Sequence, residues 1–474
     1  MNETADRPEI RVDRRADRDR HLFGKGPKKL LALDGGGVRG AITVAFLERI
    51  EKIIAEEQHK LRAEEADEQT RSQSDQGQDV KPICLGDWFD LVGGTSTGAI
   101  IAGALALGHS TAEIKDFYLR LAPRAFRRPF WRLPYLQAKF DADALSHEVN
   151  QIVGDRTLDA PDLRTGLAII TKRMDTGSPW ILANNKNSKF WNDPSDHSYI
   201  GNKHYKLAAL VRASTAAPHY FDPEVISILD AAPPGPLSSA SAQLGGLPWL
   251  KFLLTRLRAQ YAVLFKTPPD PKTHGLFVDG GVTPYNSPPL VLLMMAVLEP
   301  FGIRWSLGPE NLTIVSIGTG TFRTKVTFSE LGFAGPLRLA LGALLSVMAD
   351  NQYLALAQMQ WLGKCLTSWT INSEVGTLSL ETPPGGHWFR FARYDLGLDT
   401  DWLSQNLGLD LTDNEVKRLR RMDDPGIIKC IYGIARLAAE KQVKKEHLFP
   451  DNEQLTASTA SEQRSNGSTR EMLR

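Results

Sequence analysis

A serine with a glycine two positions away on each side lies between a predicted strand (residues 88–94) and a predicted helix (residues 97–108). The segment reads Gly94-Thr95-Ser96-Thr97-Gly98. A GxSxG pattern in this context is typical of a nucleophile elbow, where the glycines relieve crowding around a strained turn. The start of the helix favours negative charge that develops at the serine. The pattern predicts Ser96 as a nucleophile, and a Gly/Ser-rich turn without chemistry stays open as the alternative.

A glycine-rich loop, LDGGGVRG, precedes this serine and also joins a predicted strand (residues 28–34) to a predicted helix (residues 42–57). It satisfies GxGxxG, so one interpretation is pyrophosphate binding, with Glu56 near the spacing expected for a ribose-binding acid. Glu56 falls on a helical pattern rather than at a strand end, which weakens that interpretation. A nucleophilic serine needs fixed N–H donors for an oxyanion. We therefore expect the amides of Gly35, Gly36 and Gly37 to form an oxyanion hole.

Within the same loop, Arg39 has two open interpretations. It can add positive charge for a phosphate-bearing substrate, or it can pair with a carboxylate.

A base for the serine is predicted at Asp279, which ends the apolar strand GLFVD and precedes Gly280 and Gly281. A carboxylate at a strand end without crowding side chains can reach a serine at a neighbouring strand end. An Asp-Gly turn without catalytic function is the alternative. Only His387 and His447 follow Asp279 in the order Ser–Asp–His; neither lies at an obvious strand-end elbow, and His387 stays open.

Strand-like and helix-like segments alternate between residues 28 and about 320, after which helices dominate. This alternation predicts an α/β fold with a mainly parallel sheet and helices on both faces. Residues 1–27 are predicted as a disordered charged leader, and residues 449–474 as a disordered polar tail. The catalytic domain is expected over residues 28–448, with insertions at about 56–81 and 231–274.

Composition excludes several classes of protein. The 474 residues carry a formal net charge of +1, which points to no nucleic-acid partner. The N-terminus has no apolar signal region, and no run of 18 apolar residues predicts a membrane-spanning helix. Three separated cysteines without metal-ligand spacing suit a reducing compartment. We expect a cytoplasmic protein that contacts a membrane surface peripherally.

Four motifs in this order resemble the patatin-like phospholipase family: DGGGVRG, GTSTG, ASTAAPHYFDP and VDGG. The resemblance covers roughly residues 28–400 and implies a three-layer α/β/α sandwich, here with helical insertions and C-terminal helices. It implies a Ser96–Asp279 dyad without a catalytic histidine, and lipid acyl ester hydrolysis without calcium or another cofactor or metal. The motif positions that support this assignment are Asp34, Arg39, Gly40, Gly94, Gly98, Gly280 and Gly281.

Membrane contact is predicted from two segments. Residues 118–140 carry six basic residues and no acid, interleaved with aromatic residues, which favours an anionic lipid surface over nucleic acid. The apolar segment 248–265 within the second insertion is either a core helix or an interfacial helix.

Two alternative functions stay open. Some bacterial patatin-like enzymes resemble this chain and are activated by cyclic nucleotides in antiphage defence, and a non-catalytic lipid- or nucleotide-binding module is also possible. Headgroup, acyl position, hydrolase against transacylase activity and oligomeric state are not predicted.

Overall fold

A single mixed sheet organises the chain in the computed structural model, which describes residues 11–70, 83–125, 140, 142–218, 220–229, 272–323 and 336–449. Nine strands of the described residues form this sheet in the order β5-β6-β3-β2-β1-β7-β9-β8, and β4 also pairs with β3. The strands are β1 (Lys28–Leu33), β2 (Leu91–Thr95), β3 (Gly166–Arg173), β4 (Ser178–Ala183), β5 (Glu224–Ser227), β6 (His274–Asp279), β7 (Leu312–Ile317), β8 (Gly363–Cys365) and β9 (Phe389–Tyr394).

The centre of the sheet is parallel, as predicted, and one side is antiparallel. Strand β1 pairs in parallel with β2 and β7, and β2 continues in parallel to β3. Strands β4 and β6 both run antiparallel to β3, and β5 runs antiparallel to β6. Parallel strands place their carboxyl ends at one edge of the sheet, where loops that carry function collect.

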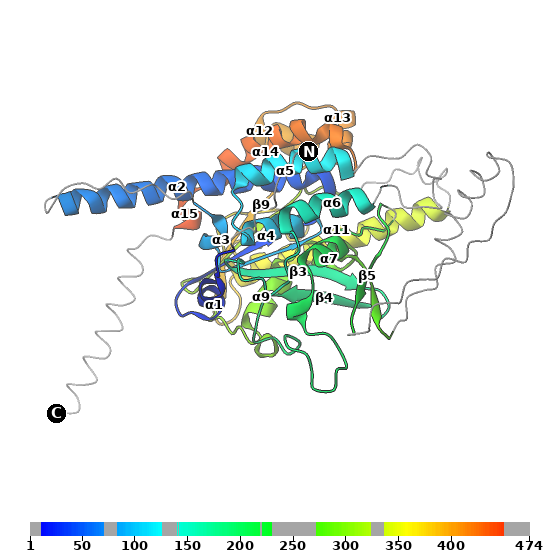
Figure 1. The fold of residues 1–474 in the computed structure, drawn as a ribbon. Coiled ribbons are helices and arrows are strands. Elements are labelled where there is room, and N and C mark those ends of the chain that lie inside the picture. The colour runs from blue at the N-terminus through cyan, green and yellow to red at the C-terminus, as the bar shows by residue number, and fades with distance from the viewer. Residues whose placement is uncertain are drawn as a thin grey trace, which may run out of the picture.

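Helices cover both faces of the sheet, so the fold has three layers (Figure 1). One core packs beneath α2 (Gly40–Thr70), α4 (Thr97–Ala106), α5 (Thr111–Ala125), α6 (Ala142–Val153), α7 (Leu207–Ser214) and α14 (Ile428–Gln442). The other core packs against α1 (Arg15–Phe23), α9 (Pro289–Val297) and α11 (Pro336–Leu362).

Alternate residues of β1 enter the two cores, as the period of two along a strand requires. The expected α/β/α sandwich is therefore confirmed.

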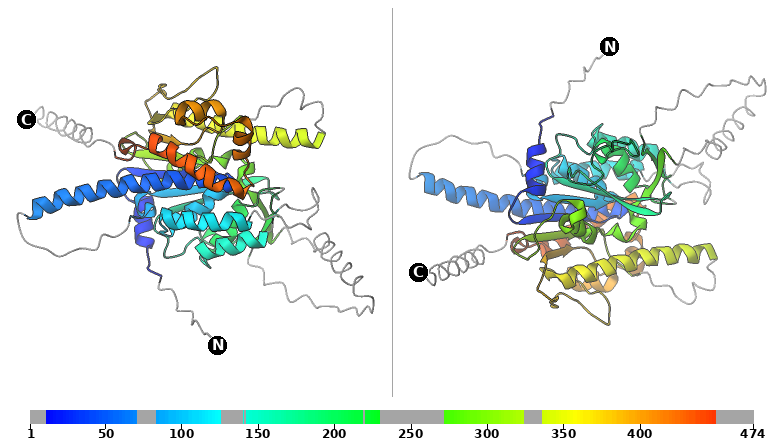
Figure 2. Two further views of the ribbon diagram at one scale, coloured as in Figure 1. Left: turned by 90° about the horizontal axis from the view of Figure 1, so that it is seen from above. Right: turned by 90° about the horizontal axis from the view of Figure 1, so that it is seen from below.

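The remaining helices are α3 (Leu85–Trp88), α12 (Thr400–Leu407), α13 (Asp413–Leu419) and α15 (Lys445–Leu448). The long helices α2 and α11 project beyond the body in opposite directions (Figure 2). No helix within the described ranges is both long and apolar enough to span a bilayer.

Several sequence expectations fall differently in the structure. Helix α1 lies inside the segment 1–27 that was predicted to be disordered, and it is held by buried Leu22 and by Arg18, which bonds Asp159. Residues 56–70 of the first predicted insertion continue α2, so Glu56 is a helical surface residue. Strand β9 was not predicted. Most of residues 231–274, most of the basic segment 118–140 and the tail beyond residue 449 lie outside the described residues.

Candidate active site

Ser96 occupies a strained turn between β2 and α4, as the GxSxG pattern predicts. Its backbone has φ 55° and ψ −124°, a conformation that costs a non-glycine residue of order 1–3 kcal/mol. A Cβ on Gly94 would lie 2.2 Å from the carbonyl carbon of Gly98, and one on Gly98 would lie 2.2 Å from the carbonyl oxygen of Leu33. The two glycines therefore allow strand, turn and helix to cross closely.

The strained turn has its own support. The N–H of Ser96 donates to Ser214 Oγ at 2.8 Å, and that hydroxyl donates to the carbonyl oxygen of Ile170 at 2.6 Å. Because Ile170 lies on β3 and Ser214 at the end of α7, two other elements fix the position of Ser96.

Asp279 lies within hydrogen-bonding distance of Ser96. Ser96 Oγ donates to Asp279 Oδ2 at 2.7 Å, and the N–H of Gly281 donates to Oδ1 at 2.7 Å. The carboxyl group is buried, with 4% of the residue exposed. Burial raises its pKa to about 6, against the opposing effects of the Ser96 hydroxyl, the Gly281 amide and the charge of Arg212. At neutral pH most of the group is ionised, so it can accept a proton.

Strand β3 brings the two residues together. Thr95, the last residue of β2, pairs with Ile170, and Asp279, the last residue of β6, pairs with Thr171. Both strands lie along the same edge of β3 but run in opposite directions, because β2 is parallel and β6 antiparallel to it. Their carboxyl ends therefore meet head to head, and this register places Ser96 beside Asp279.

The glycine-rich loop follows β1 and lies beside Ser96. A Cβ on Gly35 would lie 3.1 Å from Ser96 Cβ and 2.4 Å from Asn286 Oδ1, so a side chain there would intrude on the serine. The N–H of Gly35 already donates to the carbonyl oxygen of Asn286 at 3.0 Å. Within the described residues the amides of Gly36 and Gly37 have no protein acceptor. Of the three predicted oxyanion donors, these two remain available.

The chain that carries this arrangement matches a known protein family. The model of the family described as patatin-like phospholipase matches residues 31–293, which include the glycine loop, the elbow and the strand of Asp279. The chain belongs to the patatin-like phospholipase family.

Three relatives indicate how far this patatin-like chain resembles individual members. A cGAMP-activated phospholipase of Vibrio cholerae serotype O1 is 30% identical over 219 residues, 44% of this chain and 53% of that protein. A cGAMP-activated phospholipase of Escherichia coli is 28% identical over 199 residues, 41% of this chain and 48% of that protein. Patatin-like protein 1 of Arabidopsis thaliana is 25% identical over 322 residues, 63% of this chain and 60% of that protein. The chain thus spans about half the length of the two bacterial relatives.

The remaining motif residues of this patatin-like chain support the site. A Cβ on Gly40 would lie 2.0 Å from Thr97 Cγ2, so this glycine lets α2 begin directly against α4. A Cβ on Gly280 would lie 2.5 Å from the carbonyl oxygen of Ile170, which keeps the turn after Asp279 flat against β3. Gly281 contributes the amide that holds Asp279.

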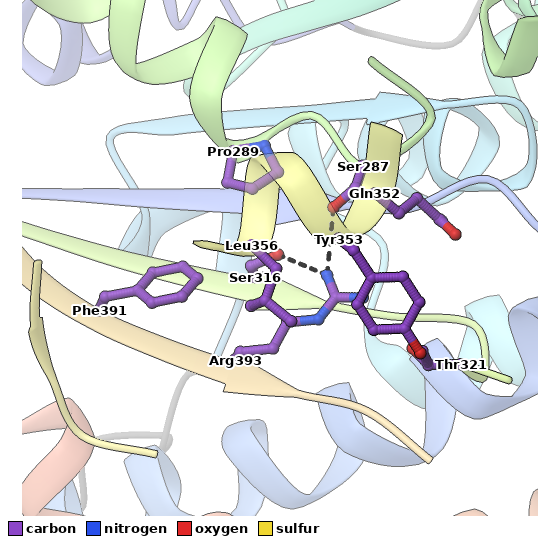
Figure 3. A pocket seen from close by; sticks show the side chains of 9 residues that line it. All are labelled: Ser287, Pro289, Ser316, Thr321, Gln352, Tyr353, Leu356, Phe391 and Arg393. Carbon is purple, nitrogen blue, oxygen red and sulfur yellow. Dashed lines mark hydrogen bonds between the residues drawn. The ribbon is translucent and has the colours of Figure 1, made fainter. Parts of the chain in front are cut away.

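Asp34 anchors the glycine loop through a buried ion cluster that sequence reasoning missed. Arg393 on β9 donates from both Nη atoms to Asp34 (3.1 and 2.7 Å) and from Nη2 to Asp395 (2.7 Å). It also donates to Ser316 Oγ at 2.8 Å and to Ser287 Oγ at 3.4 Å, as Figure 3 shows. The two carboxylates raise the pKa of Arg393 above its ordinary value despite burial. A forked guanidinium thus joins the ends of β1, β7 and β9.

A cavity of about 20 Å³ adjoins Arg393 and is lined on its other side by Gln352, Tyr353 and Leu356 of α11 (Figure 3). This volume is enough for about one water molecule, so the cavity is too small for a substrate. Arg393 therefore holds Asp34 beside a cavity that leaves no room for a substrate.

Arg39 lies against the glycine loop without an ion pair to any described residue. It donates to the carbonyl oxygen of Gly320 at 3.3 Å, and its guanidinium lies 5.3 Å from the ring centroid of Phe322. Only 6% of the residue is exposed, and burial lowers its pKa to about 10. Of the two sequence interpretations, pairing with a carboxylate is not seen within the described chain.

Neither histidine candidate lies beside the hydrogen-bonded pair of Ser96 and Asp279. His387 precedes β9 at its amino end, whereas Ser96 follows the carboxyl end of β2, and these strands are parallel members of one sheet. His387 and Ser96 therefore lie at opposite ends of the parallel strands. His447 Nδ1 lies 2.9 Å from the hydroxyl of Tyr394 and is buried there.

Proposed function

We propose that this chain hydrolyses acyl esters of lipids, with glycerophospholipids as the substrate class. The observation that carries the proposal is the 2.7 Å hydrogen bond from Ser96 Oγ to buried Asp279 at a strained elbow, beside two glycine amides without a protein acceptor. Membership of the patatin-like phospholipase family supports the substrate class. A binding module would need neither a strained serine nor a buried base, so this geometry favours an enzyme.

The proposed reaction has two steps. Ser96 Oγ attacks the ester carbonyl carbon while Asp279 accepts the hydroxyl proton, and the N–H groups of Gly36 and Gly37 donate to the oxyanion. The tetrahedral intermediate breaks its bond to the alcohol oxygen, which takes the proton from Asp279. A water molecule then gives a proton to Asp279 and attacks the acyl-enzyme. The fatty acid leaves, and the proton returns to Ser96.

The test is fatty-acid release from mixed phospholipid vesicles by the parent, Ser96→Ala and Asp279→Asn, with EDTA present and both with and without cGAMP and cUMP-AMP. We expect each variant to lose at least about two orders of magnitude in kcat while folding normally, because each removes one member of the dyad. Substitution of Ser373, an exposed serine on the connection between β8 and β9, by alanine serves as the matched control. A Ser96→Ala variant that keeps parental activity would overturn the proposal.

A second function is favoured by the relatives. Three bacterial proteins 28–30% identical to this chain are named as cGAMP-activated or cUMP-AMP-activated phospholipases. We infer that the activity of this chain is latent until a cyclic dinucleotide binds. The vesicle assay is repeated with and without cGAMP and cUMP-AMP. Release that begins only with one of these ligands supports latency, and equal release without them contradicts it.

A further inference from the structure

A second cavity, which is not lined by Ser96, Asp279 or the glycine loop, opens beside strand β4. Its volume is about 570 Å³, within the range typical of small-molecule sites. One wall is β4 itself, which contributes all six of its residues, and the opposite wall is the connection between β4 and α7. Its buried apolar lining comes from both faces of β4, with Leu182 from one core and Ala183 and Met295 from the other. Phe190, which also lines the cavity, is 48% exposed. The cavity thus continues from the surface to the core.

Aromatic rings supply much of the lining. Trp180, Phe190, Tyr199 and Tyr205 all border the cavity. Phe190 and Tyr199 meet edge to face at 5.4 Å between centroids, and Trp180 and Tyr205 do so at 6.2 Å. A flat ring gains stacking energy on such side chains, of about 1–3 kcal/mol for a base on an aromatic residue. The geometry therefore favours a planar aromatic ligand over a flexible chain.

Polar groups without partners face the same space. The hydroxyl of Tyr205 and the side-chain amide of Asn202 form no hydrogen bond with any described residue. Tyr205 is nevertheless buried, with only 5% of the residue exposed. Burial raises the pKa of Tyr205 to about 12, so this hydroxyl keeps its proton and can donate. A few polar groups in an apolar pocket orient a ligand by reading its edges.

The charge of the lining has one sign. Arg173 and Lys189 border the cavity, and no carboxylate is among its described lining residues. Arg173 is paired with Asp175 at 2.7 Å, whereas Lys189 forms no ion pair within the described chain and lies over the ring of Phe190. A free ammonium at the rim beside a stacking ring suits a phosphate attached to an aromatic base.

We propose that this cavity binds a nucleotide, with the base between the aromatic side chains and the phosphate at Lys189. The inference gives a place for the nucleotide of the proposed latency and in that respect rests on it, but it does not depend on the proposed lipid hydrolysis. Trp180 also packs edge to face on Phe277 of β6 at 5.0 Å, two residues before Asp279. A bound ligand therefore touches a side chain that supports the strand of the catalytic base.

Equilibrium binding tests the proposal with AMP, cGAMP, inorganic phosphate and palmitate as separate probes, measured by calorimetry on the full chain. The variants are Phe190→Ala and Lys189→Gln, both at exposed positions where folding is not at risk. The matched control is Lys186→Gln on the same connection, because Lys186 pairs with Asp19 and does not line the cavity. Circular dichroism confirms that all variants fold.

We expect one nucleotide to bind with one-to-one stoichiometry and to bind about tenfold more weakly to each cavity variant, with Lys186→Gln unchanged. Nucleotide binding that neither cavity variant weakens would place the site elsewhere and overturn the inference. So would the absence of saturable binding by both nucleotides, or binding by palmitate alone, which would indicate an acyl site. If the chain binds a nucleotide but releases no fatty acid, this result supports the inference and contradicts only the proposed hydrolysis.

Discussion

Asp279 combines two opposing requirements at the scale of a single residue. A base has to be ionised to take a proton, and burial of its carboxyl group disfavours ionisation. Burial raises the pKa to about 6, while the hydrogen bonds from Ser96 and Gly281 limit the increase. A base with a pKa just below neutral pH is ionised and still basic enough to accept the proton of a serine.

The first prediction is a pH profile. Since the ionised form of Asp279 is the proposed base, kcat/KM is expected to fall about tenfold per pH unit below about pH 6. The measurement is the initial rate on a soluble p-nitrophenyl ester between about pH 4.5 and 8.5, a range that extends to both sides of that pKa. A value of kcat/KM that stays constant down to about pH 4.5 would contradict the proposed role of Asp279 as the base.

The same raised pKa affects stability with a defined sign. The folded protein binds a proton at Asp279 more tightly than the unfolded chain, so stability falls as pH rises from the ordinary carboxyl pKa of 3.8 to about 6. Asp279→Asn lacks this loss and should gain stability relative to the parent over that window, by at most about 3 kcal/mol. Urea unfolding at both ends of the window measures this difference; no relative gain would contradict the assigned environment.

At the scale of elements, three segments that are distant in sequence hold the elbow. Strand β3 sets the separation of β2 and β6, and the end of α7 reaches both β3 and the turn through Ser214. The hydroxyl of Ser214 accepts from the Ser96 amide and donates to Ile170, so one oxygen satisfies two buried backbone groups. Unsatisfied buried groups are costly, which makes this bridge a support for the strained turn.

The third prediction concerns this bridge. Ser214→Ala leaves the Ser96 N–H and the Ile170 carbonyl without their partner, and it should cost about 1–3 kcal/mol of stability. We also expect kcat to fall about tenfold or more with KM unchanged, because Ser96, the proposed nucleophile, loses its fixed position. The control is Thr215→Val, since Thr215 bonds only carbonyls of its own helix. Equal kcat values for the two variants would show that the bridge has no role in positioning.

At the scale of the whole molecule, a strand from the C-terminal part of the chain supports the glycine loop. Arg393 lies on β9, beyond residues 31–293 that match the family, and yet it holds Asp34 at the start of the loop. Asp395, its second partner, accepts from the N–H of Gly320 and from the hydroxyl of Thr321. The C-terminal part of the chain is therefore needed to fix a loop near the N-terminus.

The fourth prediction tests that dependence. Arg393→Met leaves Asp34 and Asp395 buried without their counter-ion, and it should lower the free energy of unfolding by about 3–5 kcal/mol. The triple variant Arg393→Met/Asp34→Asn/Asp395→Asn should recover part of this loss, because it removes the unpaired charges. Both are compared with the parent by urea denaturation. A single variant as stable as the parent, or a triple variant less stable than the single one, would contradict the account.

Local sequence determined the elements on which chemistry depends. The glycine pattern around Ser96 and the Asp-Gly-Gly at the end of β6 specify turns whose geometry needs only a few neighbouring residues, so both were predictable. The alternation of apolar strands and helices likewise predicted the layers. Strand β9 escaped because Arg390 and Arg393 interrupt its apolar pattern, although Arg393 is buried by pairing with two carboxylates.

Only the tertiary structure decided how these elements meet. Ser214 bonds Ser96 across 118 positions, and Arg393 bonds Asp34 across 359 positions, so no local pattern contains either contact. The sequence proposed three oxyanion donors, but the fold engages Gly35 with Asn286 and leaves Gly36 and Gly37 without protein acceptors among the described residues. Residue type and spacing therefore determined which groups can react, whereas pairing register along β3 and long-range polar contacts decided which of them are adjacent and free to do so.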